Sequence, residues 1–119
     1  MAISVQWDNE ARTIIRWDFE AEWSWDELAD TARVSSAMIA TREDDVDIIL
    51  NASGTRAPNG KITPYQRSAF AYTPSNIRML VLVCGRELEA VQVVSPFFPQ
   101  LEIADDLEQA RMLLELQPA

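Results

Sequence analysis

Histidine is absent from this chain of 119 residues, which also has only one cysteine, three glycines and ten basic residues. Without histidine, the commonest general base and the commonest metal ligand in proteins are both missing. A zinc site would have to be built almost entirely from carboxylates, which is rare. We therefore predict that the chain is not an enzyme and that it binds no metal and no cofactor.

The single cysteine, Cys84, excludes a disulfide within the chain, so the usual signature of an oxidising compartment is missing. No apolar run approaches the roughly 20 residues that cross a bilayer. The first residues, Met-Ala-Ile-Ser-Val-Gln-Trp-Asp, lack the basic and apolar segments of a secretory signal. These absences predict a cytoplasmic protein that does not insert into a membrane.

Basic residues are outnumbered by nineteen acidic ones, which gives the chain a net charge of −9. A field of this sign repels phosphate polymers and anionic membranes, so nucleic acid is not an expected partner. The acidity also favours solubility. Apolar residues make up 48% of the chain, and a chain of this length buries roughly two-thirds of its unfolded surface. The sequence therefore predicts one folded domain over residues 1–119.

The first third of the chain predicts two strands and a helix. Residues 3–7 alternate between apolar and polar side chains, and residues 15–23 do so again over a longer stretch. The turn residues between them predict an antiparallel hairpin, with one face of the second strand in the core and the other in water. Ser24-Trp25-Asp26-Glu27 is a capping box, and it opens a helix that is predicted to reach Thr41.

The rest of the chain alternates strands with helices. Three segments predict strands, of which the second is expected to be the most central and the third an edge: Val46–Ala52, Met79–Cys84 and Leu101–Ala104. Three predicted helices begin at the Thr63 cap, cover residues 86–94, and follow the capping box Asp105-Asp106-Leu107-Glu108. The order β-β-α-β-α-β-α-β-α predicts an α/β domain with a five-stranded, mostly parallel sheet and an antiparallel first strand.

Four parts of this order carry a family resemblance: the hairpin, the Ser24-Trp25-Asp26-Glu27 helix start, the strand Val46–Asn51 and the segment Leu101–Ala110. Together they resemble the STAS or SpoIIAA-like domain family. The resemblance implies the SpoIIAA-like fold and a non-enzymatic interaction role. In the anti-sigma-factor antagonists of that family, the loop after the third strand carries a phosphorylated Ser in an Asp-Ser-Ser-Gly-Leu context. The matching stretch here, residues 57–63, has no Asp-Ser-Ser, and its nearest hydroxyl at the helix start belongs to Thr63.

The loop after Val46–Ala52 is the predicted location of a functional site, because sites gather beyond the carboxyl ends of strands in α/β folds. The loop and the helix start after it concentrate basic residues in an acidic chain. Thr63 is a candidate phosphoacceptor, with an ordinary helix N-cap as the plainer interpretation. The residues predicted to contact a partner or ligand are Ser53, Thr55, Arg56, Asn59, Gly60, Lys61, Thr63 and Arg67.

Two functions stay open from the sequence. The first is a non-catalytic, STAS-like regulatory or protein-interaction domain that binds a protein partner through this loop and the following helix. The second is a domain that binds a small apolar or anionic ligand in a pocket at residues 53–63. The chain could also associate as a homodimer, because its first strand is a candidate sheet edge.

Two further features have plain structural interpretations. Cys84 has no histidine to act as its base, so we predict a buried and inert core thiol. An aromatic group in the first 25 residues could line an interface, but packing of the hairpin against the first helix is the simpler account. This group consists of Trp7, Trp17, Phe19, Trp23 and Trp25.

Overall fold

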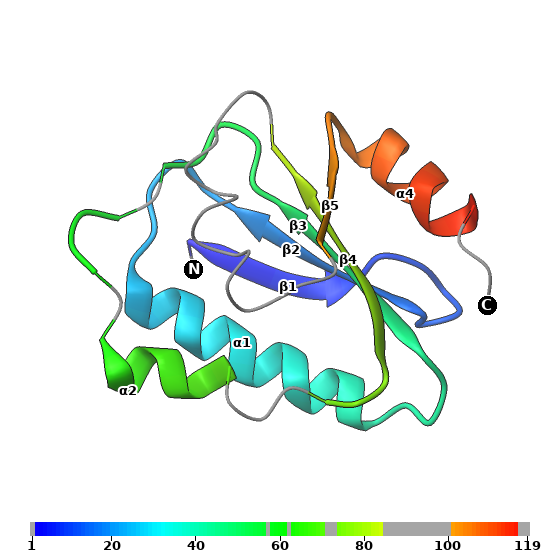
Figure 1. The fold of residues 1–119 in the computed structure, drawn as a ribbon, viewed down its shortest axis with the longest axis horizontal. Coiled ribbons are helices and arrows are strands. Elements are labelled where there is room, and N and C mark those ends of the chain that lie inside the picture. Colours follow the sequence, from blue (N-terminus) through cyan, green and yellow to red (C-terminus); the bar gives the residue numbers. More distant parts are fainter. Residues whose placement is uncertain (1, 57, 62, 71–73, 85–100, 117–119) are drawn as a thin grey trace.

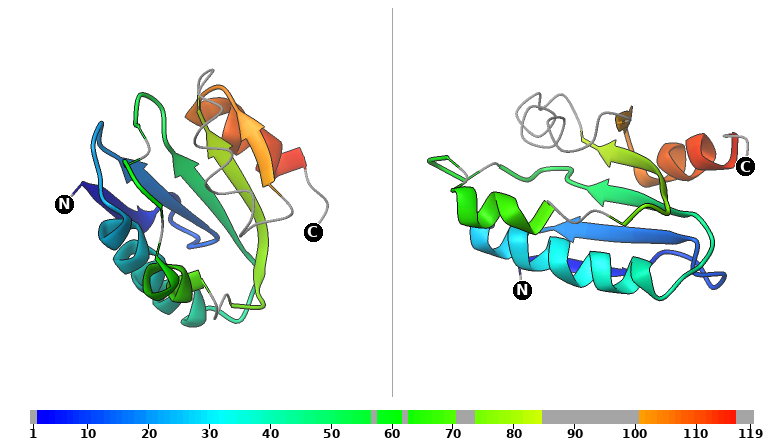
Figure 2. Two further views of the ribbon diagram at one scale, coloured as in Figure 1. Left: turned by 60° about the vertical axis from the view of Figure 1, so that its left-hand side comes forward. Right: turned by 60° about the horizontal axis from the view of Figure 1, so that its bottom comes forward.

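In a computed structural model, the chain forms a five-stranded sheet with helices on both faces (Figures 1 and 2). The structure describes residues 2–56, 58–61, 63–70, 74–84 and 101–116. The strands are β1 (Ile3–Trp7), β2 (Ile14–Phe19), β3 (Val46–Asn51), β4 (Ile77–Val83) and β5 (Leu101–Ala104). The helices are α1 (Trp25–Ala40), α2 (Pro64–Arg67), the 3₁₀ turn η1 (Ser68–Phe70) and α4 (Leu107–Leu116).

The strands lie side by side in the order β1-β2-β3-β4-β5. β1 is antiparallel to β2, and all other neighbours are parallel. The predicted α/β class and the antiparallel first strand are therefore confirmed. The prediction that Met79–Cys84 forms the most central strand is wrong, because β3 occupies the middle. β4 is nevertheless covered on both faces, which explains its uninterrupted apolar sequence. The helix predicted over residues 86–94 lies outside the described residues.

β2 ends at Phe19, four residues before its alternating sequence does. The backbone N–H of Glu20 makes the last hydrogen bond to β1, to the carbonyl of Ala2 at 2.8 Å. Two residues after the end of β2, the carbonyl of Ala21 accepts a hydrogen bond from the backbone N–H of Arg56 at 3.1 Å. The chain therefore leaves the sheet here and turns toward α1, although Trp23 still packs against the core.

The two faces of the sheet have different covers. α1 and α2 lie on one face and α4 lies on the other (Figure 2). Beneath α1, the indole N–H of buried Trp17 donates to the hydroxyl of Ser35 at 3.0 Å, so this large side chain leaves no polar atom unsatisfied. The smaller core beneath α4 consists of Ile49, Val81, Val83, Ala104, Ala110 and Leu114.

Both ends of α1 are held by side chains. At its start, the predicted capping box is present, with Ser24 accepting from the Glu27 N–H and Glu27 accepting in return. At its end, the side-chain amide of Asn76 lies within 3.2 Å of the carbonyl oxygens of Ile39, Arg42 and Asp44. The loop before β4 therefore stabilises the α1–β3 connection.

α4 begins one residue later than the sequence pattern predicts. Asp106 accepts from the backbone N–H of Gln109 at 2.8 Å, and the Gln109 side chain accepts from the N–H of Asp105 at 2.6 Å. Asp106 is therefore the capping residue, and the Gln109 side chain holds the backbone of the residue before it, with no part for Glu108. Among the described helices, none combines the length and apolar character of a membrane-spanning segment.

Candidate functional site

The loop after β3 is fixed at its base to the end of β2. The hydroxyl of Thr55 donates to the carbonyl of Glu20, and the Arg56 N–H donates to Ala21. The side chain of Thr55 is only 4% exposed. Thr55 was predicted to contact a partner or ligand, but its role in the structure is to anchor the loop. Its hydroxyl is turned inward because two neighbouring strand ends leave a backbone carbonyl there to be satisfied.

The predicted residues on either side of this anchor are exposed. Gly54 and Gly60 have φ values of +75° and +85°, a left-handed conformation that favours glycine. Each of these two glycines lies where the loop turns. Arg67 is the last residue of α2, and its side chain lies outside the described residues. The exposed members of the predicted set are Ser53, Arg56, Asn59, Gly60, Lys61 and Thr63.

Thr63 caps α2, as predicted. Its hydroxyl accepts from the backbone N–H of Gln66 at 3.2 Å, and the Gln66 side chain accepts from the Thr63 N–H at 2.9 Å. The same Gln66 side chain donates to Asp26 of α1 at 2.8 Å. The cap therefore ties α2 to the start of α1, beside a carboxylate.

α2 packs along α1, on the side where the loop ends (Figure 2). Tyr65 is 74% exposed, and the guanidinium of Arg33 lies 5.5 Å from the centre of its ring. This distance is within the range of a cation–π contact. The loop, α2 and this flank of α1 therefore form one exposed surface, which we call the loop surface.

The aromatic group belongs to the core beneath α1. Phe19 and Trp23 meet edge to face with ring centres 5.4 Å apart, and Trp23 and Trp25 do the same at 5.4 Å. All three side chains pack against the core beneath α1. The indole N–H groups of Trp23 and Trp25 are buried and have no hydrogen-bond partner among the residues that the structure describes. Core packing is thus the role that the structure supports for these rings.

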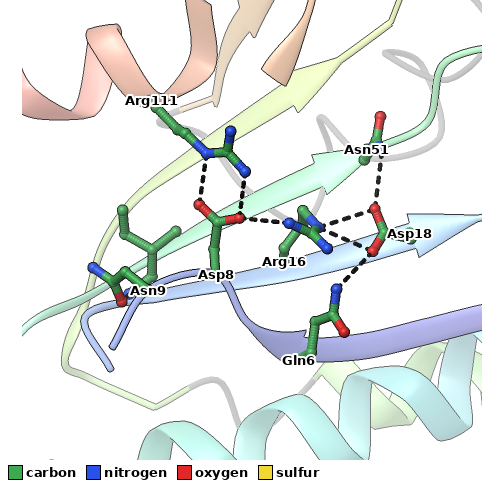
Figure 3. A network of polar contacts seen from close by, with 8 residues as sticks. Gln6, Asp8, Asn9, Arg16, Asp18, Asn51 and Arg111 are labelled. Atoms are coloured by element: carbon green, nitrogen blue, oxygen red, sulfur yellow. Dashed lines mark hydrogen bonds and ion pairs between the residues drawn. The ribbon is translucent and has the colours of Figure 1, made fainter. Parts of the chain in front are cut away.

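A polar network covers the part of the second sheet face that lies beside α4 (Figure 3). Asp8, in the turn after β1, has a side chain that is only 2% exposed. It accepts from Arg16 of β2 at 2.6 Å and from two nitrogens of Arg111 of α4 at 2.8 and 2.9 Å. Asp18 of β2 accepts from Arg16, and it also accepts from Gln6 and Asn51.

The charges of this network balance, because each carboxylate faces a guanidinium. Hydrogen bonds from Arg111 lower the pKa of Asp8; burial works in the opposite direction, and hydrogen bonds from Arg16 reinforce the lowering. This face of β2 was predicted to meet water, but Arg16 and Asp18 are half-buried and paired. Mutual pairing of this kind is typical of a structural link between elements. The register places Gln6 opposite Arg16, and the hairpin pattern itself indicates this neighbourhood. It does not indicate the contact with α4.

The cysteine and the acidic side chains are the other candidates for reactive or metal-binding groups. Cys84 is 2% exposed and lies in the core beneath α1, as predicted for an inert thiol. Within the described ranges, no group of three or more Asp, Glu or Cys side chains could hold a metal ion.

Comparisons with protein-family models, with curated proteins and with solved structures find no match. The loop surface and the polar network are therefore the two features from which a function can be argued. The charged groups of the network pair with one another, whereas Arg56 and Lys61 of the loop surface form no ion pair among the described residues.

Proposed function

We propose that the chain is a non-catalytic, STAS-like interaction domain with a SpoIIAA-like fold, and that it binds an acidic surface of a protein partner through the loop surface. The mixed sheet, with its antiparallel first strand and α1 packed against β1 and β2, is consistent with that family. The observation that carries the proposal is that Arg56 and Lys61, two exposed cations on a loop with a fixed base, form no ion pair with any described residue.

Among the described basic side chains, Arg56 and Lys61 share the lack of an ion pair only with Arg12. Most described arginines form ion pairs with carboxylates of the same chain: Arg16, Arg33, Arg42, Arg78 and Arg111. Within the described residues, neither Arg56 nor Lys61 forms such a pair, although the chain carries nineteen acidic residues. Cations of this kind attract carboxylates of a partner and guide its approach.

The fixed base of the loop also favours binding. Because Thr55 and the Arg56 backbone are tied to the end of β2, the loop loses less conformational freedom when a partner orders it. The alternative is a small apolar or anionic ligand at the same loop. A small-molecule site buries most of its ligand, whereas Arg56, Asn59 and Lys61 are exposed. This exposure favours a protein partner.

Charge reversal tests the proposal. Arg56→Glu and Lys61→Glu should each weaken capture of the partner several-fold, because an exposed ion pair contributes up to about 1 kcal/mol. The partner is first identified by photo-cross-linking from position 59 in the cells that make the protein. Binding of the purified partner is then measured by calorimetry for the wild type and each variant.

Arg12→Glu is the matched control. Arg12 is exposed, has no ion pair among the described residues, and lies in the β1–β2 turn at the opposite end of the sheet. Its reversal changes the net charge by the same amount and should leave binding unchanged. The proposal fails if both loop variants bind like the wild type, or if Arg12→Glu weakens binding equally.

A further inference from the structure

β1 is one edge of the sheet. In the part of the chain that the structure describes, β2 flanks it on one side and no strand flanks it on the other (Figure 2). Its hydrogen bonds to β2 are made by even-numbered residues: Glu20 donates to Ala2, and Asp8 donates to Ile14. Hydrogen-bonded residues alternate along an antiparallel pair. The backbone N–H and C=O groups of the odd-numbered residues therefore point outward.

The outward-pointing residues are Ile3, Val5 and Trp7, and their side chains pack on the face that α1 covers. The two residues between them, Ser4 and Gln6, are exposed and uncharged. Exposed sheet edges are commonly protected from pairing by charged side chains or proline. β1 contains neither.

This neutrality distinguishes β1 from the other strands. Each of β2, β3, β4 and β5 contains at least one charged residue. The opposite edge, β5, has four residues and an exposed Glu102, and Asp105 and Asp106 follow it. Two copies of a chain with net charge −9 repel each other, so a neutral edge is the strand surface on which they can meet at least cost.

We propose that two copies of this chain associate through β1, antiparallel and about a two-fold axis at Val5. This pairing goes beyond the proposed function, because it uses a different part of the surface. Val5 then faces Val5 of the second copy, and Ile3 faces Trp7. All outward backbone groups of the strand are paired in this register, whereas a shift by two residues leaves Ile3 or Trp7 without a partner. Ser4 faces Gln6 on the other face of the sheet, so no like charges meet.

α1 supplies a second feature of the same interface. Glu27 accepts from the backbone N–H of Ala2 at 3.1 Å, so this flank of α1 faces the start of β1. One and two turns further along the same flank lie Thr31, which is buried, and Val34, which is 46% exposed. Two-fold pairing of β1 brings the α1 helices of both copies side by side. Val34 then lies in the seam between them and is removed from water.

The test compares matched double variants by sedimentation velocity over a concentration series. The wild type should reach twice the mass of one chain. Ser4→Lys/Gln6→Lys places two pairs of like charges across the axis and should raise the dimer dissociation constant about tenfold or more. Glu102→Gln/Ile103→Lys makes the same change in charge on the β5 edge and should leave the dimer intact. Far-UV circular dichroism confirms that each variant is folded.

A complementary pair of variants tests whether the β1 strands of the two copies face each other directly. Ser4→Glu/Gln6→Glu should also be monomeric alone, but mixing it with Ser4→Lys/Gln6→Lys should restore a dimer, since each Lys then faces a Glu. Amide hydrogen exchange of the unmodified protein needs no variant: the N–H groups of Ile3, Val5 and Trp7 should become protected as concentration rises. A wild type that stays monomeric into the millimolar range would overturn the proposal. So would a dimer that survives the β1 lysines, or one in which these three amides stay unprotected.

Discussion

Asp8 is the residue at which three elements of the fold meet. It lies in the turn after β1, and its carboxylate binds Arg16 of β2 and Arg111 of α4 (Figure 3). Its side chain is 2% exposed, so the protein supplies the hydrogen bonds that water would otherwise provide. Removing one partner of a buried, charged hydrogen bond leaves the remaining groups without partners, and this lowers the free energy of unfolding.

Asp8→Asn should lower the free energy of unfolding by about 1–3 kcal/mol at neutral pH. The pKa of Asp8 is lower in the folded chain than its ordinary value, so the ionised form is favoured by folding. Its contribution is complete above the unfolded pKa of about 3.9 and is lost as the pH falls through the lower, folded value. Urea unfolding at a series of pH values should therefore show the wild type and Asp8→Asn converging below about pH 4.

Asp44→Asn is the control for this prediction. Asp44 has a side chain that is 82% exposed and a long contact of 3.6 Å to Arg42, so its removal should change stability little at any pH. A difference between wild type and Asp8→Asn that stays constant down to strongly acidic pH would contradict the account given for Asp8.

Single-residue roles were predictable where the cause is local. The Thr63 cap follows from residues three apart in the sequence, and the structure has it. The anchoring hydrogen bond of Thr55 was not predictable, because its partner, the carbonyl of Glu20, is 35 residues away. The link between Asp8 and Arg111 spans 103 residues. It depends on where α4 docks, and no local pattern in the sequence contains that information.

Among the elements, α1 and α2 carry the same capping motif with unequal consequences. Both begin with a hydroxyl cap and a reciprocal side chain three residues later. α1 has sixteen residues and contributes Leu28, Ala32 and Ile39 to the core, whereas α2 has four residues and is mostly exposed. Loss of the cap should therefore affect global unfolding only in α1.

Ser24→Ala should cost about 1 kcal/mol of the free energy of unfolding. Thr63→Ala should cost much less, because α2 can fray without exposing the core. Urea denaturation of both variants checks this, with amide exchange in α2 as the local readout. Equal losses in the two variants would show that α2 belongs to the same cooperative unit as α1.

The sequence patterns predict the ends of the elements less well than their presence. The alternation of residues 15–23 predicts a longer strand than β2, which ends at Phe19. Beyond Phe19, Glu20 still donates to the carbonyl of Ala2 beside β1, but the carbonyl of Ala21 accepts from Arg56 instead. The centre of the sheet was misplaced for a related reason: β3 and β4 are both buried on two faces, so their sequences look alike.

At the scale of the whole molecule, the net charge of −9 opposes compactness. The Debye length is about 10 Å at 0.1 M salt, so added NaCl screens most of this repulsion between exposed carboxylates. The internal pairs at Asp8 and Asp47 are shielded from salt by burial.

Thermal unfolding at neutral pH should therefore shift upward by a few degrees as NaCl rises from low ionic strength, since about 1 kcal/mol moves the midpoint by roughly 4–8 °C in a small domain. The shift should vanish in scans made near the isoelectric pH, which serve as the control. A midpoint that falls with salt at neutral pH would mean that exposed ion pairs outweigh the general repulsion. The scans are made at one fixed protein concentration, because self-association also raises the midpoint.

The position of α4 at residues 107–116 has a consequence for biosynthesis. Among the described elements, α4 is the one that covers Ile49, Val81 and Val83. A ribosome delivers the chain from its amino end, and domains fold as their segments emerge. The layer of α1 on the sheet can close once β4 is outside the exit tunnel, whereas α4 can pack on the opposite face only after Leu114 has also left the tunnel. For that interval these three strand residues lack the cover that α4 gives them in the folded chain.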